Sequence, residues 1–162
     1  IDPKFGVPRY EGYLMLADLF AAVPALGRGR TSIAFMDLAG FGKWNKDHGQ
    51  QRGDDLLALL TSHLRKIPGS RTIRDGGDEF LVVGAPGTVD LEAKLASFCA
   101  AWPEIQRSAL AGLPVVPLRI AIEDEPADKL REARERLGVS IGKVKEDHPH
   151  PPEEGVIVRY GE

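Results

Sequence analysis

Three carboxylates, placed in two separate segments of the chain, are the residues best suited to chemistry. Asp37 follows the short apolar run 32–36, whereas Asp78 and Glu79 follow two glycines and precede a second apolar run. Carboxylate oxygens without accompanying histidine or cysteine suit magnesium or manganese rather than zinc. If the fold brings the two segments together, the like charges would be costly to hold in one place unless a cation neutralises them.

The elements expected around these carboxylates follow a simple order. We expect strands at 32–37, 72–74, 80–83, 116–122 and 156–160, and helices at 10–23, 41–48, 56–64, 91–99 and 127–137. Without the extra helices, the order is strand, helix, strand, strand, helix, strand, which is the ferredoxin-like (split βαβ) plan of an α+β fold. Its first and third strands are antiparallel neighbours in the centre of the sheet, so Asp37 should face Asp78 and Glu79. Two prolines near the strand at 116–122 suggest a sheet edge.

A glycine-containing turn follows Asp37 and could serve a phosphate. It runs from Gly40 to Lys43, through Phe41 and Gly42, into a helix N-terminus that offers backbone N–H donors and a positive dipole. Such a turn is more often only a connection, and the carboxylates beside it are what favour the phosphate interpretation.

Composition limits the remaining possibilities. The chain has 162 residues, 43% of them apolar, which fits one globular domain over 1–162. Its net charge of -3 disfavours nucleic acid as a partner. Its single cysteine, Cys99, lies on the apolar face of an expected helix and is interpreted as a core residue. No apolar run approaches the length of a membrane span, so we expect no membrane contact and a cytoplasmic location. Because the chain begins with Ile1, we expect a piece of a longer multidomain signalling protein.

The pentapeptide from Gly76 to Phe80, preceded by Arg74, resembles the naming motif of the GGDEF family of diguanylate cyclases. Further landmarks fall in family order at Asp2, Gly6, Pro8, Asp37, Phe41, Asn45, Gly49, Gly53 and Asp54. The charged helix at 127–137, with Ala133 and Arg134, resembles the closing alanine-lysine helix of the family with arginine in place of lysine.

The resemblance implies a palm-type nucleotidyl cyclase fold, with a mainly antiparallel sheet flanked by helices, that condenses two GTP molecules into cyclic di-GMP and pyrophosphate. Catalysis would need a homodimer, and a sensor or regulatory domain would lie outside this fragment. By position, Asp78 and Glu79 would be catalytic, and both would hold Mg²⁺ or Mn²⁺ together with Asp37 and the backbone carbonyl of Leu38. The chemistry would be a metal-assisted phosphoryl transfer.

The resemblance also implies a substrate-binding set. Its members would be Phe41, Gly42, Lys43, Asn45, Asp54, Arg74, Gly76, Gly77 and Arg134. Asn45 and Asp54 would recognise guanine, because a carboxylate accepts from both of the donor groups that guanine presents and adenine lacks that pattern.

Several positions depart from the family pattern. Gly42 stands where a lysine is usual, with Lys43 one position late, and Gly138 stands where an arginine is expected. Ala39 and Lys46 replace common aspartates. The expected function remains that of an active diguanylate cyclase, because retained acids with no ion to bind would form a costly like-charge cluster. The departures leave two alternatives open. One is a cyclase with another cyclic dinucleotide product, and the other is a degenerate domain that binds GTP or a cyclic dinucleotide and regulates a partner without catalysis.

Overall fold

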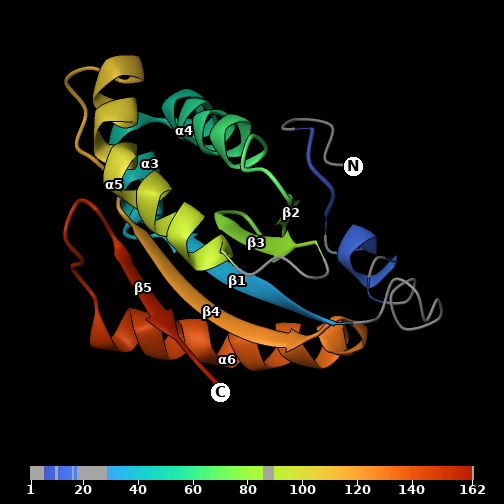
Figure 1. The fold of residues 1–162 in the computed structure, drawn as a ribbon. Coiled ribbons are helices and arrows are strands. Elements are labelled where there is room, and N and C mark those ends of the chain that lie inside the picture. Colours follow the sequence, from blue (N-terminus) through green and yellow to red (C-terminus); the bar gives the residue numbers. More distant parts are fainter. Residues whose placement is uncertain (1–5, 10, 16, 18–28, 86–89, 162) are drawn as a thin grey trace.

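The computed structural model describes residues 6–9, 11–15, 17, 29–85 and 90–161. A five-stranded sheet in the order β2-β3-β1-β4-β5 forms its centre (Figure 1). The strands are β1 (Arg30–Leu38), β2 (Ser70–Arg74), β3 (Glu79–Gly84), β4 (Leu118–Pro126) and β5 (Val156–Arg159). The helices are α3 (Phe41–His48), α4 (Gln50–Leu64), α5 (Leu91–Ala109) and α6 (Leu130–Asp147), with a 3-10 turn, η1 (Ala127–Lys129), before α6.

The strand pairing confirms the expected ferredoxin-like plan. β1 lies antiparallel to both β3 and β4, β2 and β3 form an antiparallel hairpin, and only β4 and β5 pair in parallel. All of β1 after its first residue is buried, which explains why its sequence is a nearly continuous apolar run rather than an alternating one. Asp37 sits directly opposite Glu79 in the β1–β3 ladder, as the plan predicted.

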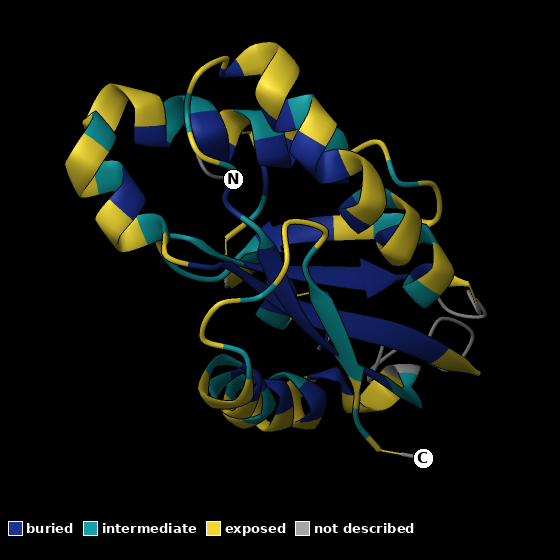
Figure 2. Cartoon of the chain, turned by 90° about the vertical axis from the view of Figure 1, so that its left-hand side faces the viewer, coloured by how far each residue is buried: buried dark blue, intermediate teal, exposed yellow. Residues whose placement is uncertain are grey.

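Two apolar layers hold the sheet between helices. On one face, even-numbered residues of β1 such as Ala34 and Met36 pack with α4 and α5. On the other face, odd-numbered residues such as Ile33 and Phe35 pack with the buried stripe of α6. That stripe is Leu130, Ala133, Leu137, Ile141 and Val144. The alternation follows from the two-residue period of a strand, and Figure 2 shows the sheet as the buried layer between exposed helical surfaces.

The structure corrects the expected edge strand. β4 lies between β1 and β5, inside the sheet. Pro114 and Pro117 both precede the first residue of β4, so neither removes a donor from its ladders, and the carbonyl of Pro117 accepts a hydrogen bond from Ala39 N at 2.8 Å. Proline before a strand therefore did not mark an edge here.

The closing helix is also longer than predicted. α6 runs to Asp147, ten residues past the expected end at 137, because Ile141 and Val144 continue its buried stripe. The segment between α6 and β5 correspondingly begins at His148. The first expected helix, 10–23, is helical at 11–15 and 17, and the rest of it lies outside the described residues.

The expectation for Cys99 is confirmed, because this residue of α5 is buried in the core. Trp44 and Trp102 are buried as well, and their indole N–H groups donate to the carbonyls of Pro114 and Val116, each at 2.9 Å. Among the helices of the described residues, none is both long and apolar enough to cross a bilayer.

Candidate functional site

One row of charged residues crosses three strands at the end of β1. Glu79 on β3, Asp37 on β1 and Arg119 on β4 are paired neighbours in the two ladders. All three have odd numbers in strands whose odd residues face α6, so their side chains share the α6 side of the sheet. The row therefore places a cation, and not only carboxylates, at the predicted site.

Arg119 binds Asp37 through two hydrogen bonds. Its Nε donates to Asp37 Oδ1 and its Nη2 to Asp37 Oδ2, both at 3.1 Å, while Nη1 donates to the backbone carbonyl of His148 at 3.1 Å. The side chains of Arg119 and Asp37 are only 10% and 5% exposed. The pairing uses both carboxylate oxygens and is the strong, planar form of the arginine–carboxylate contact.

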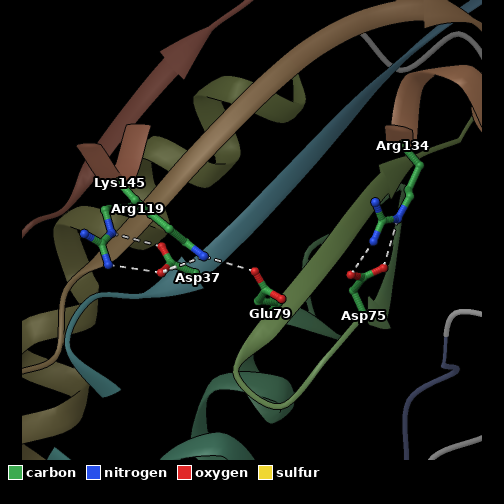
Figure 3. Close-up of polar contacts among 6 residues, drawn as sticks. All are labelled: Asp37, Asp75, Glu79, Arg119, Arg134 and Lys145. Atoms are coloured by element: carbon green, nitrogen blue, oxygen red, sulfur yellow. Dashed lines mark hydrogen bonds and ion pairs between the residues drawn. The ribbon is translucent and has the colours of Figure 1, made fainter. Parts of the chain in front are cut away.

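Lys145 from α6 lies between the two carboxylates of the row (Figure 3). Its Nζ is 3.1 Å from Glu79 Oε2 and 3.8 Å from Asp37 Oδ2. The ammonium group thus neutralises the carboxylate that Arg119 leaves without a partner, and it approaches the one that Arg119 already binds.

A second cation from α6 is bound to the hairpin. Arg134 donates from Nε to Asp75 Oδ1 at 3.2 Å and from Nη2 to Asp75 Oδ2 at 2.7 Å. Its guanidinium also lies over the ring of Phe35, 5.3 Å from the ring centroid. Arg134, which the resemblance assigned to substrate phosphate, holds α6 against the β2–β3 hairpin in this structure.

Asn45 and Asp54, the residues expected to bind the guanine base, line a cleft on the side of the hairpin opposite α6. This cleft has a volume of about 260 Å³ and is lined by Phe41, Gly42, Asn45, Gln50, Asp54, Leu57, Arg74, Gly77 and Asp78. It therefore unites most of the predicted substrate-binding residues. Glu79 instead lines a groove of about 410 Å³ on the α6 side, together with Arg134 and Lys145. The adjacent carboxylates Asp78 and Glu79 consequently belong to different hollows.

Gly53 on α4 controls the position of Asn45 on α3. A Cβ atom at residue 53 would lie 1.7 Å from Asn45 Oδ1, far inside any contact distance. Only glycine leaves room for this amide beside the helix. Gly49, with φ of 91°, separates the two helices and lets α4 start at Gln50.

Arg74 and the two glycines build the hairpin turn. Arg74 donates from Nε to the carbonyl of Gly76 at 3.0 Å and from Nη2 to that of Gly77 at 2.9 Å. Arg74 thus stabilises the β2–β3 hairpin from within, and it also lines the cleft. Lys43 points elsewhere, because its Nζ pairs with Asp47 Oδ2 at 2.6 Å and its side chain is 83% exposed.

The environment of Asp78 favours its protonated form. Partial burial raises the pKa of this carboxyl above its ordinary value, and the charge of Asp37 raises it further. The repulsion between carboxylates that the sequence led us to expect therefore acts on Asp78. Asp37 and Glu79, in contrast, have cationic partners.

A divalent metal does not fit the carboxylates as they are arranged. Both oxygens of Asp37 are taken by Arg119, and Lys145 stands between Asp37 and Glu79. Over the described part of the chain, no three His, Cys, Asp or Glu side chains are grouped so that they could hold one ion. Leu38, whose carbonyl was the expected fourth ligand, pairs with Leu118 in the β1–β4 ladder. Metal binding by these residues stays a prediction of the resemblance.

Sequence reasoning missed Arg119, Lys145 and Asp75. Arg119 could have been noticed as a charge between the apolar residues Leu118 and Ile120 of a buried strand. Lys145 was placed beyond the expected end of its helix. Asp75 stands directly before the two glycines, and nothing local to it indicates a partner 59 residues away.

The sheet order, the hairpin and the flanking helices define the class of fold: this is the palm-type fold of GGDEF domains. Among solved structures, the GGDEF domain of DgcB from Caulobacter crescentus, in complex with c-di-GMP, superposes with a TM-score of 0.79 at 16% identity, covering 98% of this chain and 94% of that one. An active GGEEF domain of a diguanylate cyclase from Vibrio cholerae gives 0.76 at 17%, covering 96% and 98%. The FimX GGDEF domain from Pseudomonas aeruginosa gives 0.71 at 17%, covering 98% of each chain.

These identities show a shared fold. The sequence matches no protein-family model and no curated protein. The activity of this chain therefore has to be argued from its own site.

Proposed function

We propose that this domain binds a guanine nucleotide in the cleft between α3, α4 and the hairpin, and regulates a partner domain without converting the nucleotide. The observation that carries the proposal is a division within the site. Asn45 and Asp54 line an open cleft, whereas Asp37 and Glu79 on the other side are bound by the chain's own cations. The half that holds Asn45 and Asp54 contains a hollow of about 260 Å³ that a ligand can enter, and in the other half Asp37 and Glu79 are paired with cations of the chain.

The chemistry of the cleft supports guanine over adenine. The carboxylate of Asp54 can accept from the N1–H and the exocyclic amine of guanine, and the amide of Asn45 can both donate and accept. Adenine has an acceptor at N1, which would face the Asp54 carboxylate without a proton between them. GTP and cyclic di-GMP both present guanine, and the DgcB structure named above contains c-di-GMP.

Isothermal titration calorimetry with GTP, ATP and cyclic di-GMP tests the proposal. We expect a guanine ligand to bind at least about tenfold more tightly than ATP, because an unpaired acceptor in the site penalises adenine. Asp54→Ala should remove that preference. Asp55→Ala is the matched control, since Asp55 is the next carboxylate on α4 but pairs with Gln51 and Arg52 outside the cleft. Equal binding of GTP and ATP, or equal losses in the two variants, would overturn the proposal.

Diguanylate cyclase activity is the second candidate function. It is favoured by the retained acids, since Asp37 and Glu79 are paired across β1 and β3 with Asp78 next to them. The test incubates an artificially dimerised domain with GTP and ATP together, in Mg²⁺ or Mn²⁺, and separates the products by chromatography. Cyclic di-GMP among the products would establish diguanylate cyclase activity. Another cyclic dinucleotide would establish a cyclase with a different product. GTP binding without either product supports the non-catalytic domain.

A further inference from the structure

The row Glu79–Asp37–Arg119 contains its own counter-cations. Asp37 and Glu79 each meet a cation, Arg119 from β4 and Lys145 from α6, so the charges of these two carboxylates are balanced within the chain. A group of carboxylates at a sheet edge is ordinarily neutralised by a bound ion. Here two side chains from different elements supply that neutralisation.

We infer that Arg119 and Lys145 occupy the place of the divalent metal, so that this site works without Mg²⁺ or Mn²⁺. The inference deepens the proposed function, because it concerns the same site, but its test needs no nucleotide. Three observations carry it: the double hydrogen bond of Arg119, the position of Lys145 and the burial of the pair.

The double hydrogen bond engages both oxygens of Asp37. An ion that approached Asp37 would have to displace the Arg119 guanidinium. That group donates two hydrogen bonds of 3.1 Å to the Asp37 carboxylate and a third to the carbonyl of His148. That third contact fixes Arg119 from the segment after α6, which makes the displacement harder than for a surface arginine.

Lys145 blocks the remaining approach. With Nζ 3.1 Å from Glu79 and 3.8 Å from Asp37, it holds the position from which one ion could contact both carboxylates. A divalent ion there would also meet the positive charges of Lys145 and Arg119 at short range, in a place where Asp37 is 4% exposed and water screens little.

The burial of the Asp37–Arg119 pair makes the two side chains costly to separate. An exposed ion pair can open at little cost, but separating a buried one leaves an uncompensated charge in the interior. Metal binding therefore becomes possible only when the resident cations are removed, and this is the point that the experiment addresses.

The experiment measures Mn²⁺ binding to the nucleotide-free domain, by electron paramagnetic resonance of free Mn²⁺ and by the melting temperature. The wild-type domain should show no saturable binding up to millimolar Mn²⁺. The double variant Arg119→Gln/Lys145→Gln should bind one Mn²⁺ ion. At a Mn²⁺ concentration 100 times the Kd of that site, the variant should melt about 5–10 °C higher than the same variant without Mn²⁺. Lys143→Gln, an exposed lysine on the same helix, is the matched control and should behave as wild type.

Each outcome decides the inference. Stoichiometric Mn²⁺ binding by the wild type overturns it, and so does a folded double variant that gains none. If the double variant does not fold on its own, refolding it in millimolar Mn²⁺ decides, because an ion that takes the place of both cations should restore the fold. Recovery of the fold with one bound Mn²⁺ supports the inference, and no recovery overturns it. A domain that fails to bind guanine nucleotides would refute the proposed function and leave these metal results unchanged.

Discussion

Asp37 and Arg119 face each other across β1 and β4 and are joined by two hydrogen bonds of 3.1 Å. The first prediction concerns this pair. Arg119→Leu should lower the free energy of unfolding by about 3–5 kcal/mol, because it leaves the Asp37 carboxylate buried without its arginine. Adding Asp37→Leu should recover much of that loss, since no buried charge then remains. Urea denaturation of both variants measures the change.

The control for that prediction is an exposed ion pair. Lys43→Ala removes the partner of Asp47 at the surface of α3 and should change stability by less than about 1 kcal/mol. A loss of similar size in Lys43→Ala and Arg119→Leu would show that burial is not what makes the Asp37 pair important.

A second prediction concerns the close contact between Gly53 and Asn45. Gly53→Ala places a Cβ where Asn45 Oδ1 now lies, so the amide must move. We expect weaker guanine-nucleotide binding, by about tenfold, which corresponds to the loss of roughly one hydrogen bond. Gly142→Ala is the matched control, because nothing lies near its Cβ position and α6 gains about 0.5–1 kcal/mol from the better helix former. Calorimetric titration with both variants distinguishes a positional effect from a general effect of the substitution.

The pairing of Asp75 with Arg134 leads to a third prediction, in which a substitution increases binding. Asp75 takes two donors of Arg134 that could otherwise contact phosphate. Asp75→Asn should therefore bind GTP more tightly than the wild type, by about threefold to tenfold, with little gain for guanosine, which has no phosphate. An equal gain for guanosine and GTP would contradict phosphate binding by the released Arg134. It would indicate instead a change in the cleft itself.

The fourth prediction concerns the thiol of Cys99. Burial raises its pKa to about 12, so the native protein holds it as the unreactive thiol throughout the neutral and mildly alkaline range. We expect no labelling by a thiol reagent between pH 7 and pH 9 in the folded domain. Labelling should be rapid at the same pH in urea, where the thiol regains its ordinary pKa. Rapid labelling of the native protein would show that the helix α5 exposes this residue.

The sequence by itself determined the order of the first four strands, but not the place of β5 beside β4, and it determined the pairing of Asp37 with Glu79. Both rest on local signals, namely apolar runs of strand length, paired glycines in a hairpin and the regular consequence of the split βαβ plan. The family resemblance identified the cleft residues Asn45, Asp54 and Asp78 in advance, because they stand at family positions along the sequence.

Only the tertiary structure decided what neutralises the carboxylates. Asp37 meets Arg119 at a separation of 82 residues, and Glu79 meets Lys145 at 66. These partners depend on the register of β4 against β1 and on the length of α6, which are set by packing of apolar faces rather than by any local pattern. From the sequence, crowded acids implied a bound metal. In the folded chain, the register supplies a guanidinium and an ammonium group at the same place.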